Sequence, residues 1–257
     1  MSTYLSELFG LSGRTAVVTG GSSGIGRAMA GALGRAGARV VLVARRPEPL
    51  ADTVGELTAD GVEAGAVTVD LADRAALTAA TDTIVARYGE PDVLVNAAAV
   101  NLRPPLESLT DSDWDVTLAA NLTAPFLLGQ RFGAAMAARG WGRIINVVSQ
   151  QAFRAYGNSG AYGVSKAGLV ALTRSQAEAW SARGVCCNAV APGVVHTPLT
   201  EPVFADPEKV AAHARRAMIG RNGIPGDFAG CAVFLASSAS AAVTGQTLFV
   251  DGGYSST

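Results

Sequence analysis

A glycine-rich turn directly after the first β-branched run constrains this chain more than any other feature of its sequence. Residues 15–19 read TAVVT, which is typical of a buried strand, and residues 20–26 read GGSSGIG before an alanine-rich, helix-forming segment. A strand, a tight turn and a helix N-terminus in this order direct backbone N–H groups and the positive end of the helix dipole at one point, where a pyrophosphate can bind. The turn therefore predicts a dinucleotide site.

Short β-branched runs alternate with longer Ala- and Leu-rich segments along the whole chain. This alternation is typical of βαβ units, which build a parallel sheet with helices on both faces. The predicted strands are 15–19, 39–44, 63–69, 93–96, 142–148, 185–190 and 247–250. The predicted helices include 26–35, 75–88, 114–138 and 162–182. The sequence thus predicts an α/β fold, a single Rossmann-type, doubly wound domain over residues 1–257 with about seven parallel strands.

The composition narrows the class of protein. A chain of 257 residues, of which 49% are hydrophobic, can bury the core of one α/β domain. Its 20 Lys and Arg residues nearly balance 21 Asp and Glu residues without a basic cluster, so we expect no nucleic-acid partner. The sequence lacks an uninterrupted apolar stretch of the roughly 20 residues that a membrane helix needs. Residues 1–10 do not read as a signal peptide, and we expect a soluble, cytoplasmic protein with no membrane partner.

The cysteines and histidines have neither disulfide nor metal-site spacing. Cys186 and Cys187 are adjacent, and with one further cysteine they are expected to be reduced, buried thiols. His196 and His213 are the only histidines and stand too far apart in sequence to indicate a metal site. We therefore expect no metal.

A tyrosine and a lysine are the strongest candidates for catalysis. Tyr162 and Lys166 are four residues apart in a predicted helix, so their side chains lie on the same face, one turn apart. A neighbouring ammonium stabilises a phenolate and lowers the pKa of the phenol, which favours proton exchange with an alcohol or ketone. Ser149 follows the strand predicted at 142–148, at the edge where open sheets bind their ligands. We predict Tyr162 as the general acid/base.

The end of the second predicted strand indicates which dinucleotide binds. An acidic residue there would accept a hydrogen bond from the ribose 2′-hydroxyl and repel a 2′-phosphate. This chain instead has Ala44 followed by Arg45 and Arg46, whose planar guanidinium groups suit a phosphate. The hydroxyls of Ser22 and Ser23 are available to the same group. The predicted cofactor is NADP(H).

Motifs in a fixed order along nearly the whole chain resemble those of the short-chain dehydrogenase/reductase family. The glycine turn has the spacing T-G-x-x-x-G-x-G, and the Y-x-x-x-K pair follows a serine. The other matching elements are Asp70-Leu71, Asn96-Ala97-Ala98-Ala99, Asn121, Pro192-Gly193, Thr197, Gly245-Gln246 and Asp251-Gly252-Gly253. The chain departs from the family at Ala97 and Ala99, which replace the second asparagine and the glycine of an N-N-A-G turn. The added β-carbon at Ala99 is expected to shift this turn slightly.

The resemblance implies roles for individual residues. Tyr162 exchanges the proton, Ser149 hydrogen-bonds the substrate oxygen, and Lys166 and Asn121 support a proton relay, Asn121 through a distortion of its helix and a bound water. Together with the residues predicted above, the expected cofactor contacts are Gly20, Ser22, Ser23, Gly24, Ile25, Gly26, Arg45, Arg46, Asp70, Leu71, Asn96, Tyr162, Lys166, Pro192, Val195 and Thr197. Among them, Asp70 and Leu71 are expected at the adenine, and Val195 and Thr197 at the carboxamide.

The predicted function is hydride transfer between NADP(H) and a small-molecule ketone or secondary alcohol, with reduction as the expected direction. Polar residues between Ser149 and Tyr162 suit a hydroxylated substrate such as a keto-sugar acid of the 5-ketogluconate type, and a 3-ketoacyl thioester is the rival that the resemblance implies. A non-catalytic NADP-binding redox sensor is the alternative from another class, because a fold alone does not fix a function. The Y-x-x-x-K pair disfavours a third class, the methyltransferases.

Two further expectations concern the surface. The segment 197–220 is interrupted by prolines and is predicted to be an irregular lid over the substrate. The resemblance also implies a homodimer or homotetramer that associates through the predicted helices 114–138 and 162–182.

Overall fold

A seven-stranded sheet forms the centre of the computed structural model, which describes residues 3–256. Met1, Ser2 and Thr257 lie outside the described residues. The sheet has the order β3-β2-β1-β4-β5-β6-β7, and every neighbouring pair of strands is parallel. The strands are β1 (Thr15–Thr19), β2 (Arg39–Ala44), β3 (Ala64–Thr68), β4 (Val93–Asn96), β5 (Gly142–Val147), β6 (Val185–Pro192) and β7 (Thr247–Val250).

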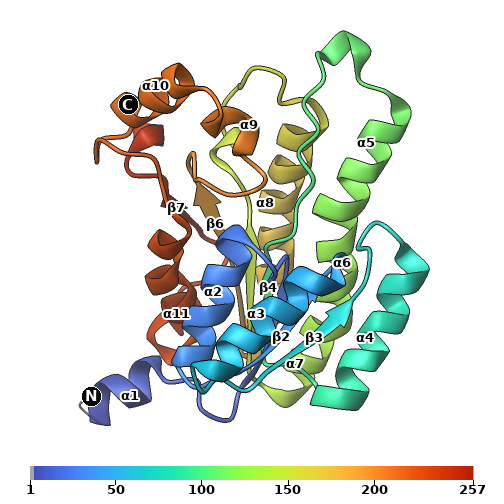
Figure 1. Cartoon of the computed structure of the whole chain (residues 1–257). Coiled ribbons are helices and arrows are strands. Elements are labelled where there is room, and N and C mark those ends of the chain that lie inside the picture. Colours follow the sequence, from blue (N-terminus) through green and yellow to red (C-terminus); the bar gives the residue numbers. More distant parts are fainter. Residues whose placement is uncertain (1–2, 257) are drawn as a thin grey trace.

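Helices cover both faces of this sheet (Figure 1). One face packs against α2 (Gly24–Arg35), α3 (Pro47–Ala59) and α11 (Ala229–Ala236). The other packs against α4 (Arg74–Tyr88), α6 (Ala124–Leu128), α7 (Ala134–Arg139) and α8 (Gly160–Trp180), with α5 (Asp111–Leu118) alongside α8. Three short helices lie outside these layers: α1 (Thr3–Phe9), α9 (Glu201–Phe204) and α10 (Pro207–Arg216). The structure confirms the predicted doubly wound α/β fold.

Alternation along the strands divides the core into two layers. Val18 and Val40 point into the layer with α2, whereas Val17 and Val41 point into the layer with α4. All four are buried, as expected for a parallel sheet with both faces covered. Because full burial of each such side chain contributes about 1.5–3 kcal/mol, these runs fix which strands lie at the centre of the sheet.

The strand order creates a crevice at the centre of the sheet. β1 pairs with β2 on one side and with β4 on the other, so the connections after these strands leave toward opposite faces. Open sheets bind ligands outside the carboxyl ends of strands at such a reversal. The glycine-rich turn that follows β1 therefore lies at the expected binding position.

Most element boundaries match the prediction, but the long helices are less regular than expected. The single helix predicted at 114–138 runs from Asp111 to Arg139 with two π-helical turns, Ala119–Thr123 and Gly129–Gly133. The helix predicted at 162–182 begins at Gly160 and ends at Trp180, and a short 3₁₀ turn follows it. Helices α3 and α11 were not among the predicted elements.

The segment 197–220 is more ordered than the irregular lid that we expected. It contains α9 and α10, and each begins with a proline in its first turn, Pro202 and Pro207. A proline is tolerated there because the first-turn N–H groups have no partner within the helix. Asp206 adds an N-cap, since its carboxylate accepts hydrogen bonds from the backbone N–H groups of Glu208 and Lys209. Reading these prolines only as interruptions was wrong.

All three cysteines are free thiols: Cys186 and Cys187 are buried, and Cys231 is partly exposed. Among residues 3–256, none of the helices combines the length and the apolar character needed to cross a membrane.

Candidate active site

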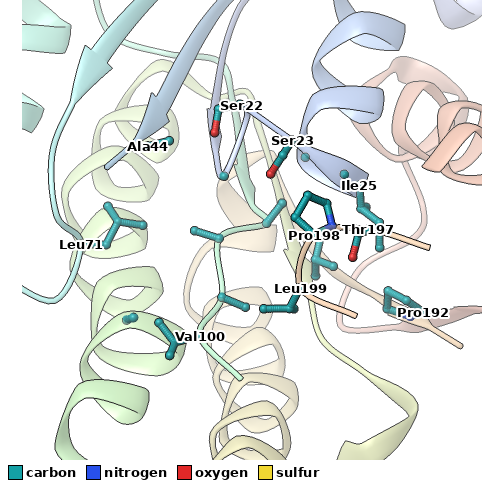
Figure 2. Close-up of a pocket in the computed structure, with 18 of the residues that line it drawn as sticks. Ser22, Ser23, Ile25, Ala44, Leu71, Val100, Pro192, Thr197, Pro198 and Leu199 are labelled. Atoms are coloured by element: carbon teal, nitrogen blue, oxygen red, sulfur yellow. The ribbon is translucent and has the colours of Figure 1, made fainter. Parts of the chain in front are cut away.

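A cleft of about 480 Å³ opens at the carboxyl ends of the central strands (Figure 2). Eight segments line it: the turn 20–26, the end of β2 at 44–46, residues 69–71 and 97–100, Ala120, the end of β5 at 147–149, Tyr162 with Lys166 on α8, and residues 192–200. Most of the residues predicted from the sequence to bind a dinucleotide therefore lie in one cleft.

The glycine turn forms one wall of the cleft and approaches its neighbours closely. Gly20 has a φ of 68°, and a β-carbon on it would lie 2.8 Å from the backbone nitrogen of Ala98. A β-carbon on Gly26 would lie 2.4 Å from the carbonyl oxygen of Gly20. Ser23 is the N-cap of α2, and within the described chain its side chain makes no capping hydrogen bond. The N-terminus of α2 thus presents backbone N–H groups to the cleft, which suits an anionic group.

The departure from the family's N-N-A-G turn lies against this glycine turn. The hydroxyl oxygen of Thr19 accepts hydrogen bonds from the backbone N–H groups of Ala97 and Ala98, at 3.1 and 3.2 Å. Residues 97–100 line the cleft, whereas Asn96 lies beneath them and donates from Nδ2 to Oδ1 of Asn146 at 2.8 Å. Asn96 is therefore a buried support of the wall, behind the surface that a cofactor would touch.

Ser149, Tyr162 and Lys166 meet at the bottom of the cleft. Ser149 follows β5, and its hydroxyl hydrogen-bonds the phenol of Tyr162. Tyr162 and Lys166 are one turn apart on α8, with 7% and 1% of their surfaces exposed. The ammonium of Lys166 donates to the carbonyl oxygen of Val147 at 2.7 Å and lies 5.8 Å from the centre of the Tyr162 ring.

Burial governs the ionisation of both groups. Burial raises the pKa of Tyr162 above its ordinary 10.0, and the hydrogen bond from Ser149 and the charge of Arg103 lower it only in part. Burial also lowers the pKa of Lys166 from 10.5 to about 7. The expected lowering of the phenol's pKa by Lys166 is thus not the main effect, because the ammonium is directed at Val147 and is itself desolvated.

Asn121 lies in the first π-helical turn and is fully buried. Its Oδ1 accepts a hydrogen bond from the N–H of Val100, and its Nδ2 donates to the carbonyl of Val100, both at 2.8 Å. Nδ2 also lies 3.1 Å from the hydroxyl of Ser165, which donates to the carbonyl of Tyr162. Asn121 therefore joins the loop 97–100 to the turn of α8 that carries Tyr162.

The opposite end of the cleft carries the residues predicted at the adenine and its ribose. Arg45 and Arg46 are exposed directly after β2, and Nη1 of Arg45 lies 3.7 Å from the carboxylate of Asp70. Asp70 also accepts a hydrogen bond from the N–H of Ala72. Leu71 projects into the cleft beside Ala44 (Figure 2). The two arginines thus border the cleft with their guanidinium groups in solvent.

The loop after β6 closes the third side. Pro192 and Thr197 project into the cleft (Figure 2), and Val195 pairs with Gly223 through an isolated bridge. His196 stacks on Phe204 of α9 with ring centres 4.2 Å apart. The position predicted for a carboxamide is therefore directly connected to α9.

Arg103 lies beside the loop after β5, outside the lining of the cleft, and no sequence motif predicted a role for it. Its charge is close enough to lower the pKa of Tyr162, its guanidinium lies over the ring of Tyr156, and it donates to the carbonyl of Gly157 at 2.6 Å. Throughout residues 3–256, Arg103 has no carboxylate within ion-pair distance. It stands in a loop without a motif, so only its place in the fold identifies it.

Comparison with known proteins finds dehydrogenases and reductases that are similar to nearly the whole chain. A family model described as "Enoyl-(Acyl carrier protein) reductase" matches residues 20–255. The chain is 38% identical to the gluconate 5-dehydrogenase of Gluconobacter oxydans over 247 residues, 96% of each chain. It is 40% identical to the D-threitol dehydrogenase of Mycolicibacterium smegmatis over 248 residues, 96% of this chain and 94% of the relative.

A solved structure extends the similarity to three dimensions. The gluconate 5-dehydrogenase of Burkholderia cenocepacia, in complex with NADP and tartrate, superposes with a TM-score of 0.93 at 36% identity, covering 98% of this chain and 99% of that one.

Proposed function

The chain belongs to the short-chain dehydrogenase/reductase family, and we propose that it is an NADP(H)-dependent oxidoreductase whose substrate is a keto-sugar acid or the matching hydroxy acid. The observation that carries this proposal is the meeting of Ser149, Tyr162 and Lys166 at the bottom of a dinucleotide-sized cleft. A redox sensor would have no use for a proton donor there, which argues against the alternative.

The cleft fits NADP(H). The turn 20–26 gives a pyrophosphate room, since a side chain at Gly20 or Gly26 would collide with backbone. Within residues 3–256 the first-turn N–H groups of α2 receive no side-chain cap from Ser23, which leaves them to bind an anion. Arg45 and Arg46 stand where a 2′-phosphate would bind, with their guanidinium groups in solvent; the exposed ion pair of Arg45 with Asp70, at 3.7 Å, is weak enough to give way to a phosphate. When bound, the cofactor supplies or accepts a hydride. Pro192, Val195 and Thr197 would orient its reacting ring.

Tyr162 is the proposed general acid in reduction and general base in oxidation. Its high pKa keeps the phenol protonated at neutral pH, so it can donate a proton to the developing alkoxide of a ketone. Ser149 would hydrogen-bond the same oxygen. Lys166 holds an ammonium beside the phenol and, with Asn121, anchors this turn of α8 to the strands and to the loop 97–100.

Arg103 favours an anionic substrate over a neutral one. Among residues 3–256 it has no carboxylate partner, and its charge is within electrostatic reach of the Tyr162 phenol, which suits the carboxylate of a sugar acid. The relative from Gluconobacter oxydans and the solved neighbour are named for gluconate, which has such a carboxylate. The 3-ketoacyl thioester is the rival substrate, and a solved neighbour from Agrobacterium tumefaciens, 36% identical, is named 3-oxoacyl (acyl-carrier-protein) reductase.

The proposal is tested by measuring turnover of NADPH and NADH with 5-keto-D-gluconate, acetoacetyl thioester and, in the oxidative direction, D-gluconate and D-threitol. We expect turnover of the sugar acid with NADPH preferred. Arg103→Gln should raise KM for D-gluconate by about tenfold and leave D-threitol unaffected, because only the acid offers a charge to pair. Turnover of the thioester with none of the sugar acid would transfer the assignment to the rival.

Three features of the whole protein are part of the proposal. The segment 197–220 acts as the substrate lid, the protein works in the cytoplasm, and it assembles as a homodimer or homotetramer through α5–α7 and α8. Sedimentation that finds only monomer at micromolar concentration would contradict the assembly.

A further inference from the structure

His213 connects the lid to two segments that are distant from it in sequence. It lies in α10. The hydroxyl of Tyr156, in the loop after β5, is 3.2 Å from both its Nδ1 and its Nε2, and the hydroxyl of Tyr254, near the C-terminal end, is 3.2 Å from its Nδ1. The rings of His213 and Tyr156 stack with an angle of 20° between their planes. The two hydroxyls also hydrogen-bond each other. One imidazole thus joins three segments.

Helix α10 has few other attachments. Within the described chain it contributes no buried residue, so hydrophobic packing holds it weakly. A cavity of about 230 Å³ lies against it, with walls that include His213, Tyr254 and the cofactor-loop residues Val194 and Val195. Asn222 adds a hydrogen bond from Nδ2 to the carbonyl of Val210 at 2.9 Å. The guanidinium of Arg216, at the end of α10, also lies 4.6 Å from the ring centre of Tyr254, so His213 and Arg216 together carry a large share of the attachment.

We propose that His213 is a positioning residue: its neutral ring, shared between Tyr156 and Tyr254, fastens α10 beside the active site and so holds the Tyr156 loop against Arg103. The inference rests on the proposed function, because it concerns how that site retains its substrate. When the hydrogen bonds of His213 break, α10 moves away from the loop that carries Tyr156. The guanidinium of Arg103 then loses its contact with the Tyr156 ring, and the substrate binds more weakly. The chemical step, which depends on Tyr162, is unaffected.

The charges around His213 oppose its protonation. Burial lowers its pKa below the ordinary 6.5, and the charges of Arg103 and Arg216 lower it further. The titratable and charged groups that face it from the packed segments are Tyr156, Tyr254, Arg103, Arg154, Arg216, Arg221, Asp227 and Asp251. Both carboxylates in this set already have partners: Asp227 accepts from Arg221, and Asp251 accepts from the backbone N–H groups of Gly253 and Ser255.

The sign of the pH effect follows from these charges. The fastened state binds a proton less tightly than the open state, in which the ring is in water with an ordinary pKa of about 6.5. A fall in pH below that value therefore favours the open state. Protonation makes both ring nitrogens donors, so the tyrosine hydroxyls must both accept, and it places a positive charge beside Arg103 and Arg216. We expect the lid to be fastened at neutral pH and released in acid.

Hydrogen–deuterium exchange of the full-length protein tests the attachment without any ligand. At about pH 7.5, His213→Ala should speed exchange of the α10 amides by about tenfold and leave those of α8 unchanged, since two hydrogen bonds of ordinary strength are lost. In wild type, the α10 amides should lose protection near pH 5.5. His213→Gln keeps an uncharged acceptor, so it should be protected nearly as well as wild type at pH 7.5 and keep that protection at pH 5.5. Arg215→Ala, on the exposed side of the same helix, is the matched control and should behave as wild type.

Steady-state kinetics with 5-keto-D-gluconate then separate the roles. His213→Ala should raise KM by about tenfold with kcat within about twofold, and Tyr156→Phe should give a smaller rise in KM. Unchanged exchange of α10 in His213→Ala, or equal protection at both pH values in wild type, would overturn the inference. Faster exchange in a protein that turns over no sugar acid would support the attachment and reject the proposed substrate, so the two failures are distinguishable.

Discussion

Tyr162 and Lys166 are both buried in the wall of the cleft, and that burial pushes each of them toward its neutral form. Their spacing in the sequence correctly indicates that they lie one turn apart on a helix, but it contains no information on desolvation. The neutral phenol is the form that reduction requires, because it must donate a proton. A lysine whose pKa is about 7 can be neutral or charged near physiological pH, so it can respond to a change in the charge of the phenol.

The buried lysine should make stability depend on pH. Its pKa in the folded protein is about 7, against 10.5 when unfolded, so between these values the unfolded chain binds more protons and stability rises with pH. From pH 7 to pH 10, the unfolding free energy of wild type should rise by up to about 3 kcal/mol relative to that of Lys166→Met, which has no group that titrates at this position. Urea denaturation of both proteins at the two pH values measures it. A difference that does not change with pH would mean that the ammonium stays charged and solvated.

The two arginines after β2 should set the choice of cofactor. Replacing both Arg45 and Arg46 by alanine removes the two positive charges predicted to pair with a 2′-phosphate, so Kd for NADPH should rise by about tenfold or more while Kd for NADH stays the same. Fluorescence titration measures both constants. Arg183→Ala is the control for loss of charge, because this exposed arginine precedes β6 and lies at the amino ends of the strands, away from the cleft. An equal loss for both dinucleotides would show that the arginines act on the fold and not on the phosphate.

At the scale of elements, two irregularities position the site. The π-helical turn Ala119–Thr123 interrupts what the sequence predicts as one helix, and it carries Asn121 to the backbone of Val100. An asparagine in the middle of a helix indicates a local disturbance, but its partner lies in a loop that only the tertiary structure brings near. The first-turn prolines of α9 and α10 are the second case, because the same residues that end helices in mid-sequence also begin them.

Removing the side-chain amide of Asn121 should affect both stability and activity. In Asn121→Leu the N–H and carbonyl of Val100, which is partly buried beside the cleft, lose their side-chain partners, which should cost about 1–3 kcal/mol of unfolding free energy. The loop 97–100 should also loosen, and kcat should fall. Asn121→Asp keeps the acceptor for the Val100 N–H and should lose less stability. Denaturation curves of the two variants that coincide with wild type would contradict this role.

At the scale of the whole molecule, the sequence predicted the architecture correctly but did not predict the side-chain contacts between segments that are remote in sequence. The alternation of strands and helices predicted the doubly wound sheet and the edge at which Ser149 and the glycine turn meet, because strand ends in a parallel sheet share one side. Family motifs supplied the residues that line the cleft. Arg103, His213 and the pairing of Tyr156 with Tyr254 have no motif, since their contacts join segments that are remote in sequence.

The most direct test of the account is the consumption of NADPH by wild type and by Tyr162→Phe with 5-keto-D-gluconate. We predict that wild type turns over and that the variant, which lacks only the phenol oxygen, loses kcat by about a thousandfold while its Kd for NADPH stays within about twofold. Turnover by Tyr162→Phe at the wild-type rate, or wild-type protein that binds NADPH and reduces no ketone, would contradict the assignment of this cleft as a hydride-transfer site.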